Sequence, residues 1–166
     1  MALLGVARFA VVQAQSDWER GQQKRDWRER PVLLPQYPSQ ERLVPFFVSS
    51  ASSFQFFVDA ASVETGKDGV VRYALVVRSA AGAESITYEG IRCETGDYRI
   101  YASGVGGAWT PATGGWRRIE PRSVQRWHNA LYQEYFCPLG EPIRSSAEGV
   151  NALRSGDHPS RRLTGP

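Results

Sequence analysis

Residues 88–104, YEGIRCETGDYRIYASG, predict a β-hairpin, because two strand-like segments flank the tight turn ETGD. The preceding segment VVRYALVVR, residues 70–78, alternates an apolar face with a mixed face, which predicts a half-buried antiparallel strand. The turn SAAGAES joins the two stretches, so three consecutive strands are expected to form a β-meander. Gly90 interrupts the middle strand, as a β-bulge or a close approach of another group would require.

The register of the second hairpin is predicted from its turn. If the hairpin closes symmetrically about Thr95 and Gly96, Arg92 lies opposite Arg99. Like charges directly across a ladder are unfavourable. Neutralisation is therefore expected from a bound anion or from one of the nearby acidic side chains, Glu89, Glu94 or Asp97.

The other elements are predicted by aromatic content and by spacing. FQFFVDAASV, residues 54–63, predicts a further strand, and GKDG, residues 66–69, predicts a turn. A C-terminal helix is expected over residues 121–136, since apolar side chains recur at helical spacing at Val124, Trp127, Leu131 and Tyr135. The predicted fold is α+β: an antiparallel sheet of four to six strands, with this helix packed on one face and one disulfide.

A second helix is predicted nearer the C-terminus. Ser145 and Glu148 form a capping box, Val150 and Leu153 face inward, and Gly156 ends the helix. The domain organisation that follows has four parts. Residues 1–14 are a truncated signal peptide, 15–42 a polar and Pro-rich extension, 43–159 a single α+β domain and 160–166 a flexible tail.

Composition excludes several classes of protein. The chain has 166 residues, of which 42% are hydrophobic and 22% are charged, as is typical of one globular domain. Its formal net charge of +3 is small and spread along the chain, so we expect no nucleic-acid partner.

The N-terminal stretch MALLGVARFAVVQA is apolar and then turns polar, with Val12 and Ala14 placed as at a signal-peptidase site. Arg8 and the missing basic start depart from a complete signal, so a buried N-terminal helix is the alternative. The run is shorter than the roughly 20 residues that a bilayer requires, so no integral membrane segment is expected in the mature chain.

Cys93 and Cys137 are the only cysteines. In an exported protein they meet an oxidising compartment, where a disulfide is the expected state. Free buried thiols or a reactive cysteine are the alternatives. The pair lacks the short ligand spacing of zinc motifs, and neither a metal site nor a cofactor is expected.

The candidate binding residues lie on the strands and in the glycine-rich segment that follows them. Arg72, Arg92, Arg99 and Tyr101 form a potential anion-binding strip, although a solvated, salt-bridged sheet face explains them as well. In GVGGAWTPATGGW, residues 104–116, Trp109 or Trp116 is a candidate platform for a sugar or an aromatic ligand. An unliganded hairpin or mobile loop is the alternative.

His128 is the remaining candidate for chemistry. It lies on the predicted long helix, and as a general base it would need a carboxylic acid such as Glu134 or Glu89 within hydrogen-bond reach. A packed structural histidine is the alternative, and His158 in GDHP is expected to make a turn contact through its ring. No catalytic residue is assigned, because no metalloprotease motif, nucleophile elbow or phosphate-binding loop is present.

The order of several motifs resembles a known family. FQFFVDAASV, DGVVRYALVVRSAAGAE, YEGIRCETGDYRIYASG, EYFCP and GDHP together resemble the cryptic neisserial protein-like family of bacterial envelope proteins, over residues 43–159. This resemblance implies an exported domain of Gram-negative bacteria with cysteines at these two positions. It implies no activity.

Three functions are therefore open. The leading hypothesis is a periplasmic, non-catalytic binding or interaction module that recognises an envelope protein or an anionic or glycan ligand through the arginine and tyrosine face and the tryptophan loop. The rival hypothesis is a small hydrolase or lyase acting on cell-wall material through His128. A purely structural role in an envelope complex is the third, which a large exposed apolar patch would favour.

Overall fold

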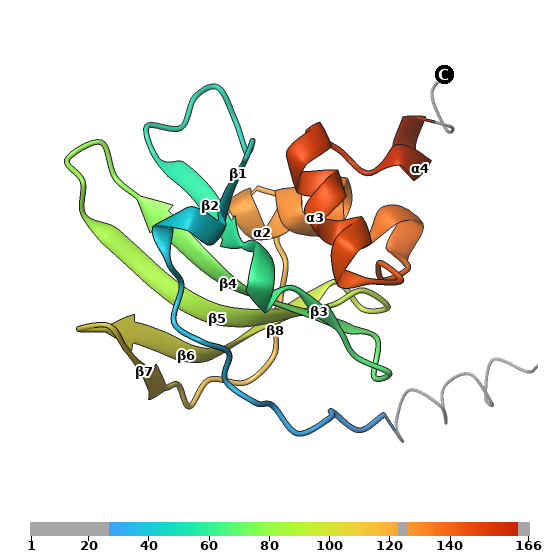
Figure 1. Ribbon diagram of the computed structural model, residues 1–166. Coiled ribbons are helices and arrows are strands. Elements are labelled where there is room, and N and C mark those ends of the chain that lie inside the picture. Colours follow the sequence, from blue (N-terminus) through green and yellow to red (C-terminus); the bar gives the residue numbers. More distant parts are fainter. Residues whose placement is uncertain (1–26, 123–125, 163–166) are drawn as a thin grey trace, which may run out of the picture.

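An antiparallel sheet with helices on one face forms the protein, as a computed structural model that describes residues 27–122 and 126–162 shows (Figure 1). Six strands follow the order β1-β2-β4-β5-β6-β7, and two short strands, β3 and β8, pair with β4 and β6. The strands are β1 (Leu43–Phe46), β2 (Gln55–Asp59), β3 (Glu64–Thr65), β4 (Val70–Arg78), β5 (Glu84–Arg92), β6 (Asp97–Val105), β7 (Ala108–Pro111) and β8 (Arg117–Arg118). The predicted α+β class and antiparallel sheet are confirmed.

The meander is confirmed, but the predicted register of its second hairpin is wrong. Arg92 pairs with Asp97, and Arg99 pairs with Gly90, so the two arginines do not face one another. The reason is that the loop comprises residues 93–96, one residue earlier than the predicted turn. Gly96 ends this loop with φ +67° and donates its N–H to the carbonyl of Arg92 at 2.9 Å. The register shift in this hairpin falls between Tyr88 and Glu89.

Gly90 is explained by a close approach. A Cβ atom at this position would lie 2.5 Å from the Tyr101 hydroxyl oxygen and 2.9 Å from a methyl carbon of Val70. Only a residue without a side chain leaves room for Tyr101 on the neighbouring strand.

Strand β4 is buried on both faces, which corrects the prediction of a half-buried strand. Val71, Tyr73 and Leu75 point into the main core beneath the helices. Ala74 points the other way, into a second and smaller core with Tyr88, Tyr101 and Ala102. The periodicity of the strand could not reveal this, because the cover comes from a distant part of the chain.

That cover is the N-terminal segment 27–39, here called the strap. It crosses the sheet on the side away from the helices, as the blue trace in Figure 1 shows. Val32 packs against the second core, and the indole Nε1–H of Trp109 donates to the carbonyl of Pro35 at 2.9 Å. Four prolines between positions 31 and 45 keep this part of the chain extended.

The helical layer consists of α2 (Arg126–Ala130), a π-helical continuation η3 (Leu131–Phe136), α3 (Ser146–Ser155) and α4 (Pro159–Arg162). Three short 3-10 turns complete the elements: η1 (Gln40–Arg42), η2 (Ala60–Ser62) and η4 (Pro138–Gly140). The predicted helix start at Pro121 is wrong, because residues 121 and 122 form a turn. Leu131 and Tyr135 of the predicted stripe are buried and Trp127 packs against the core, while Val124 lies outside the described residues.

The second predicted helix is confirmed as α3. Ser145 accepts a hydrogen bond from the N–H of Glu148, and Gly156 ends the helix with φ +86°. The Glu148 carboxylate accepts from the N–H of Arg144 at 2.6 Å rather than from that of Ser145. In the described part of the chain no helix has the length and apolar character needed to cross a membrane.

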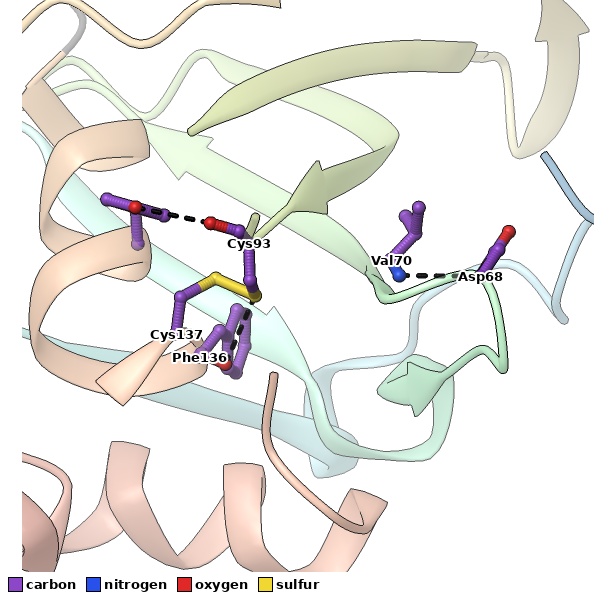
Figure 2. Close-up of a disulfide and its surroundings, with 6 residues drawn as sticks. Asp68, Val70, Cys93, Phe136 and Cys137 are labelled. Atoms are coloured by element: carbon purple, nitrogen blue, oxygen red, sulfur yellow. Dashed lines mark hydrogen bonds between the residues drawn. A yellow bond between two sulfur atoms is a disulfide. The ribbon is translucent and has the colours of Figure 1, made fainter. Parts of the chain in front are cut away.

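The disulfide between Cys93 and Cys137 is confirmed, with an S–S distance of 2.05 Å and a Cα–Cα distance of 5.3 Å (Figure 2). Cys93 lies in the loop between β5 and β6, and Cys137 directly follows η3. Both are buried. The hydroxyl of Tyr132 also donates to the carbonyl of Cys93 at 3.2 Å, so a covalent bond and a hydrogen bond join the helical layer to the meander.

Candidate functional site

The predicted anion-binding strip is assembled in space, and its anion is supplied by the chain itself. The carboxylate of Glu29, in the strap, accepts from the Tyr101 hydroxyl at 2.6 Å and from the Arg99 guanidinium at 2.7 Å. A guanidinium nitrogen of Arg72 lies 3.6 Å from the same carboxylate. Three of the four predicted strip residues therefore converge on one acidic side chain 40 or more positions away in sequence.

Arg72 lies at the bottom of this strip and is 0% exposed. Its guanidinium pairs with Asp68 at 2.6 Å, and Asp68 is itself held by the backbone N–H of Arg30 at 2.8 Å. Burial opposes the charge on Arg72, but the hydrogen bond and charge of Asp68 outweigh it and raise the pKa of Arg72 above its ordinary value. Arg72 is thus a permanently charged, internally paired group that offers no open surface to a ligand.

Tyr101 remains protonated in the same cluster. Burial and the hydrogen bond to Glu29 raise the pKa of Tyr101 well above that of a free tyrosine. Its ring also lies beneath the guanidinium groups of Arg72 and Arg99, at 5.6 and 5.5 Å from the centroid. The hydroxyl therefore acts as a hydrogen-bond donor to Glu29.

Arg92 is separated from this convergence point. It pairs with Glu94 at 2.7 Å, and its guanidinium lies 4.0 Å from the ring centroid of Trp27 in the strap. The Trp27 indole Nε1–H donates to the carbonyl of Asp68 at 2.8 Å. Arg92 therefore helps to hold the start of the strap.

The two candidate tryptophans also contact the strap. Trp109 packs against Tyr37 with ring centroids 5.1 Å apart, in addition to its bond to Pro35. Trp116 packs edge-on against Trp27 at 5.8 Å. Neither ring stands free as a platform, and both are only partly exposed.

His128 lies in a buried polar network on the other face of the sheet. Its ring stacks on Tyr98 at 3.8 Å, and its Nε2 lies 2.8 Å from the Glu89 carboxylate. Tyr73 and Thr87 donate to the same carboxylate at 3.1 and 2.7 Å. Burial and the neighbouring Glu89 raise the pKa of Tyr73 well above its ordinary value, so its hydroxyl stays protonated and donates.

The His128 and Glu89 pair meets the distance that acid–base chemistry requires, but not the access. His128 is 2% and Glu89 is 2% exposed, and among the described residues neither of them lines the hollows beside β1, α2, the loop after β1 or β8. Glu134, the second candidate acid, lines a surface hollow whose lining includes neither His128 nor Glu89. A buried carboxylate with three internal hydrogen-bond partners stabilises the packing of helix on sheet.

His158 makes the expected ring contacts: its Nε2 lies 2.8 Å from Glu148, and its Nδ1 accepts from the N–H of Ser160. Across the described residues, no cluster of acidic, histidine and cysteine side chains is arranged to hold a metal ion.

Sequence reasoning missed the acidic partners of the strip, Glu29 and Asp68. Both lie in segments that read as polar extension or turn, and no local pattern links them to strands far along the chain. It also missed an apolar hollow beside Phe54 and Trp127, because the loop that forms it carries no motif.

A family model described as the CNP1-like family matches residues 22–154. This match includes the strap, the whole sheet and most of α3. No curated protein and no solved structure matches the chain.

Proposed function

This chain belongs to the CNP1-like family, and on that premise we propose that it is an exported, periplasmic, non-catalytic binding module of the Gram-negative cell envelope. The fuller description of the family as cryptic neisserial protein-like envelope proteins, which the sequence motifs suggested, is part of this proposal. So is the signal peptide at residues 1–14, which lie outside the described residues.

The observation that carries the proposal is the buried disulfide between Cys93 and Cys137. Disulfides of this kind form and persist in oxidising compartments and are rare in the cytosol. Both sulfur atoms lie inside the core between sheet and helix, where a pair of cysteines stabilises the fold rather than reacting with a substrate. Export is the setting in which this arrangement is stable.

Catalysis by the candidate chemical groups is disfavoured because these groups are engaged internally. Arg72, Arg99 and Tyr101 hold Glu29, and His128 holds Glu89 beneath the surface. The cell-wall hydrolase hypothesis needs His128 beside an open cleft, and the burial of this ring supports a structural role instead.

Cell fractionation tests the proposal. The full chain is expressed in a Gram-negative host, and the distribution of the protein between osmotic-shock fluid and cytosol is compared with that of a cytosolic marker enzyme. The protein is expected in the shock fluid with its N-terminal residues removed. Retention with the cytosolic marker would contradict the assignment of export.

A further inference from the structure

A hollow of about 360 Å³ lies between the loop that follows β1 and the first residues of α2. Its lining includes aromatic, serine and arginine side chains: Phe54, Phe56, Trp127, Ser49, Ser52 and Arg126. Ligand sites in proteins are typically mostly apolar hollows of a few hundred Å³ with a small number of polar groups. This hollow has that composition and has no role in the strip or in the network of His128.

The apolar part of the hollow is aromatic. Phe56 packs against Trp127 with ring centroids 5.7 Å apart, and Phe54 stands at the rim with 50% of its surface exposed. Among the described residues, the buried indole Nε1–H of Trp127 has no acceptor. An exposed phenylalanine beside a partly buried tryptophan is a wall suited to an apolar side chain.

The loop that forms the other wall is held by its own serines. Ser49 Oγ accepts from the N–H of Ala51 at 3.2 Å, and Ser52 Oγ accepts from the N–H of Phe54 at 3.1 Å. These short-range hydrogen bonds fix the direction of the loop and keep Phe54 at the rim of the hollow.

Arg126 supplies the charge at this hollow. It is exposed, and within the described part of the chain its guanidinium forms no ion pair or hydrogen bond, whereas Arg72, Arg92 and Arg99 are all paired. Arg126 and Val48 also line a neighbouring hollow, together with Glu134 and Phe47. An open guanidinium beside an aromatic wall is complementary to a ligand that combines an apolar group with a carboxylate.

We propose that this hollow binds the C-terminal end of a partner peptide, with a terminal apolar side chain against Phe54 and Trp127 and the terminal carboxylate on Arg126. The hollow is open and its lining is polar as well as apolar, which suits a peptide end better than a long alkyl chain. The serine hydroxyl groups in its wall suit peptide N–H and carbonyl groups. This inference rests on the proposed role as a binding module and names the partner class and the site.

Nuclear magnetic resonance of the purified, disulfide-bonded full chain tests this inference. N-acetyl-leucyl-phenylalanine is titrated into the ¹⁵N-labelled protein in parallel with its C-terminal amide, and the indole resonance of Trp127 is followed. Both probes are expected to shift this resonance, and the acid is expected to bind about fivefold more tightly than the amide, as one exposed charged pair would provide.

Matched variants assign the two contacts. Arg126→Gln is expected to remove the advantage of the acid, and Phe54→Ala to weaken both probes, while Arg117→Gln and Val105→Ala, at exposed positions outside the hollow, change neither. Three results would overturn the proposal: shifts absent or confined to other surfaces, an acid preference that survives in Arg126→Gln, or decanoate binding as tightly as the acid probe. Because this assay uses purified protein, its failure is distinct from a failure of export.

Discussion

Among single residues, Glu89 is a charged group buried beside the main core and held by several hydrogen bonds. It is buried and accepts hydrogen bonds from Tyr73 and Thr87 while its carboxylate contacts the ring of His128. Glu89→Gln keeps the shape but places an amide N–H₂ among donors, so we expect the free energy of unfolding to fall by about 2–3 kcal/mol. Urea denaturation measures this, with Glu120→Gln at an exposed position as the control. A change no larger than that of the control would contradict the assigned network.

The pairing of the Asp68 carboxylate predicts that the free energy of unfolding depends on pH. Burial raises the pKa of Asp68, but the hydrogen bond from Arg72 and the N–H groups of Arg30 and Val70 outweigh it, so the pKa lies below its ordinary value of 3.8. A depressed pKa means that the carboxylate contributes stability fully above pH 3.8 and loses this contribution as the pH falls through the lower value of the folded state. Asp68→Asn is expected to lower the free energy of unfolding by about 2–4 kcal/mol near neutral pH. In urea titrations the difference between the two proteins should shrink in acid, and a constant difference would contradict the pairing.

Among the structural elements, the strap covers the second face of the sheet. Its attachment depends on Glu29, so Glu29→Ala is expected to loosen residues 27–39 while leaving the disulfide-linked core folded. Leu33 is 83% exposed, and chymotrypsin should cleave there faster in the variant than in the parent. Glu141→Ala, at an exposed position after η4 and outside the strap contacts, is the matched control. Equal cleavage rates in all three proteins would show that Glu29 does not hold the strap.

The same element marks the limit of prediction from sequence. The meander, the N-cap at Ser145 and the stripe through Leu131 and Tyr135 were predictable, because each depends on local periodicity or on residues three or four apart. The burial of β4 on both faces was not, because it depends on Glu29 meeting Arg99 across 70 positions. The hairpin register failed for a smaller reason: the loop comprises residues 93–96 and is centred one residue earlier than the predicted turn.

At the scale of the whole molecule, one covalent bond joins the helical layer to the meander. Replacing both Cys93 and Cys137 by alanine is expected to lower the free energy of unfolding by about 2–4 kcal/mol, since the unfolded chain loses its cross-link. Urea denaturation of the oxidised parent and of the double variant measures this difference. A reductant should destabilise the parent and leave the variant unchanged. If reduction leaves the parent unchanged, the bond does not stabilise the fold.

Thiol labelling in cells tests whether this bond forms outside the cytosol and holds the exported fold together. Living cells are quenched with acid, the fractions are separated, and a mass-tagged maleimide is applied with and without prior reduction. The expected result is that the periplasmic protein takes up no label until it is reduced and then takes up two labels, at Cys93 and Cys137. Label on the unreduced protein would contradict it.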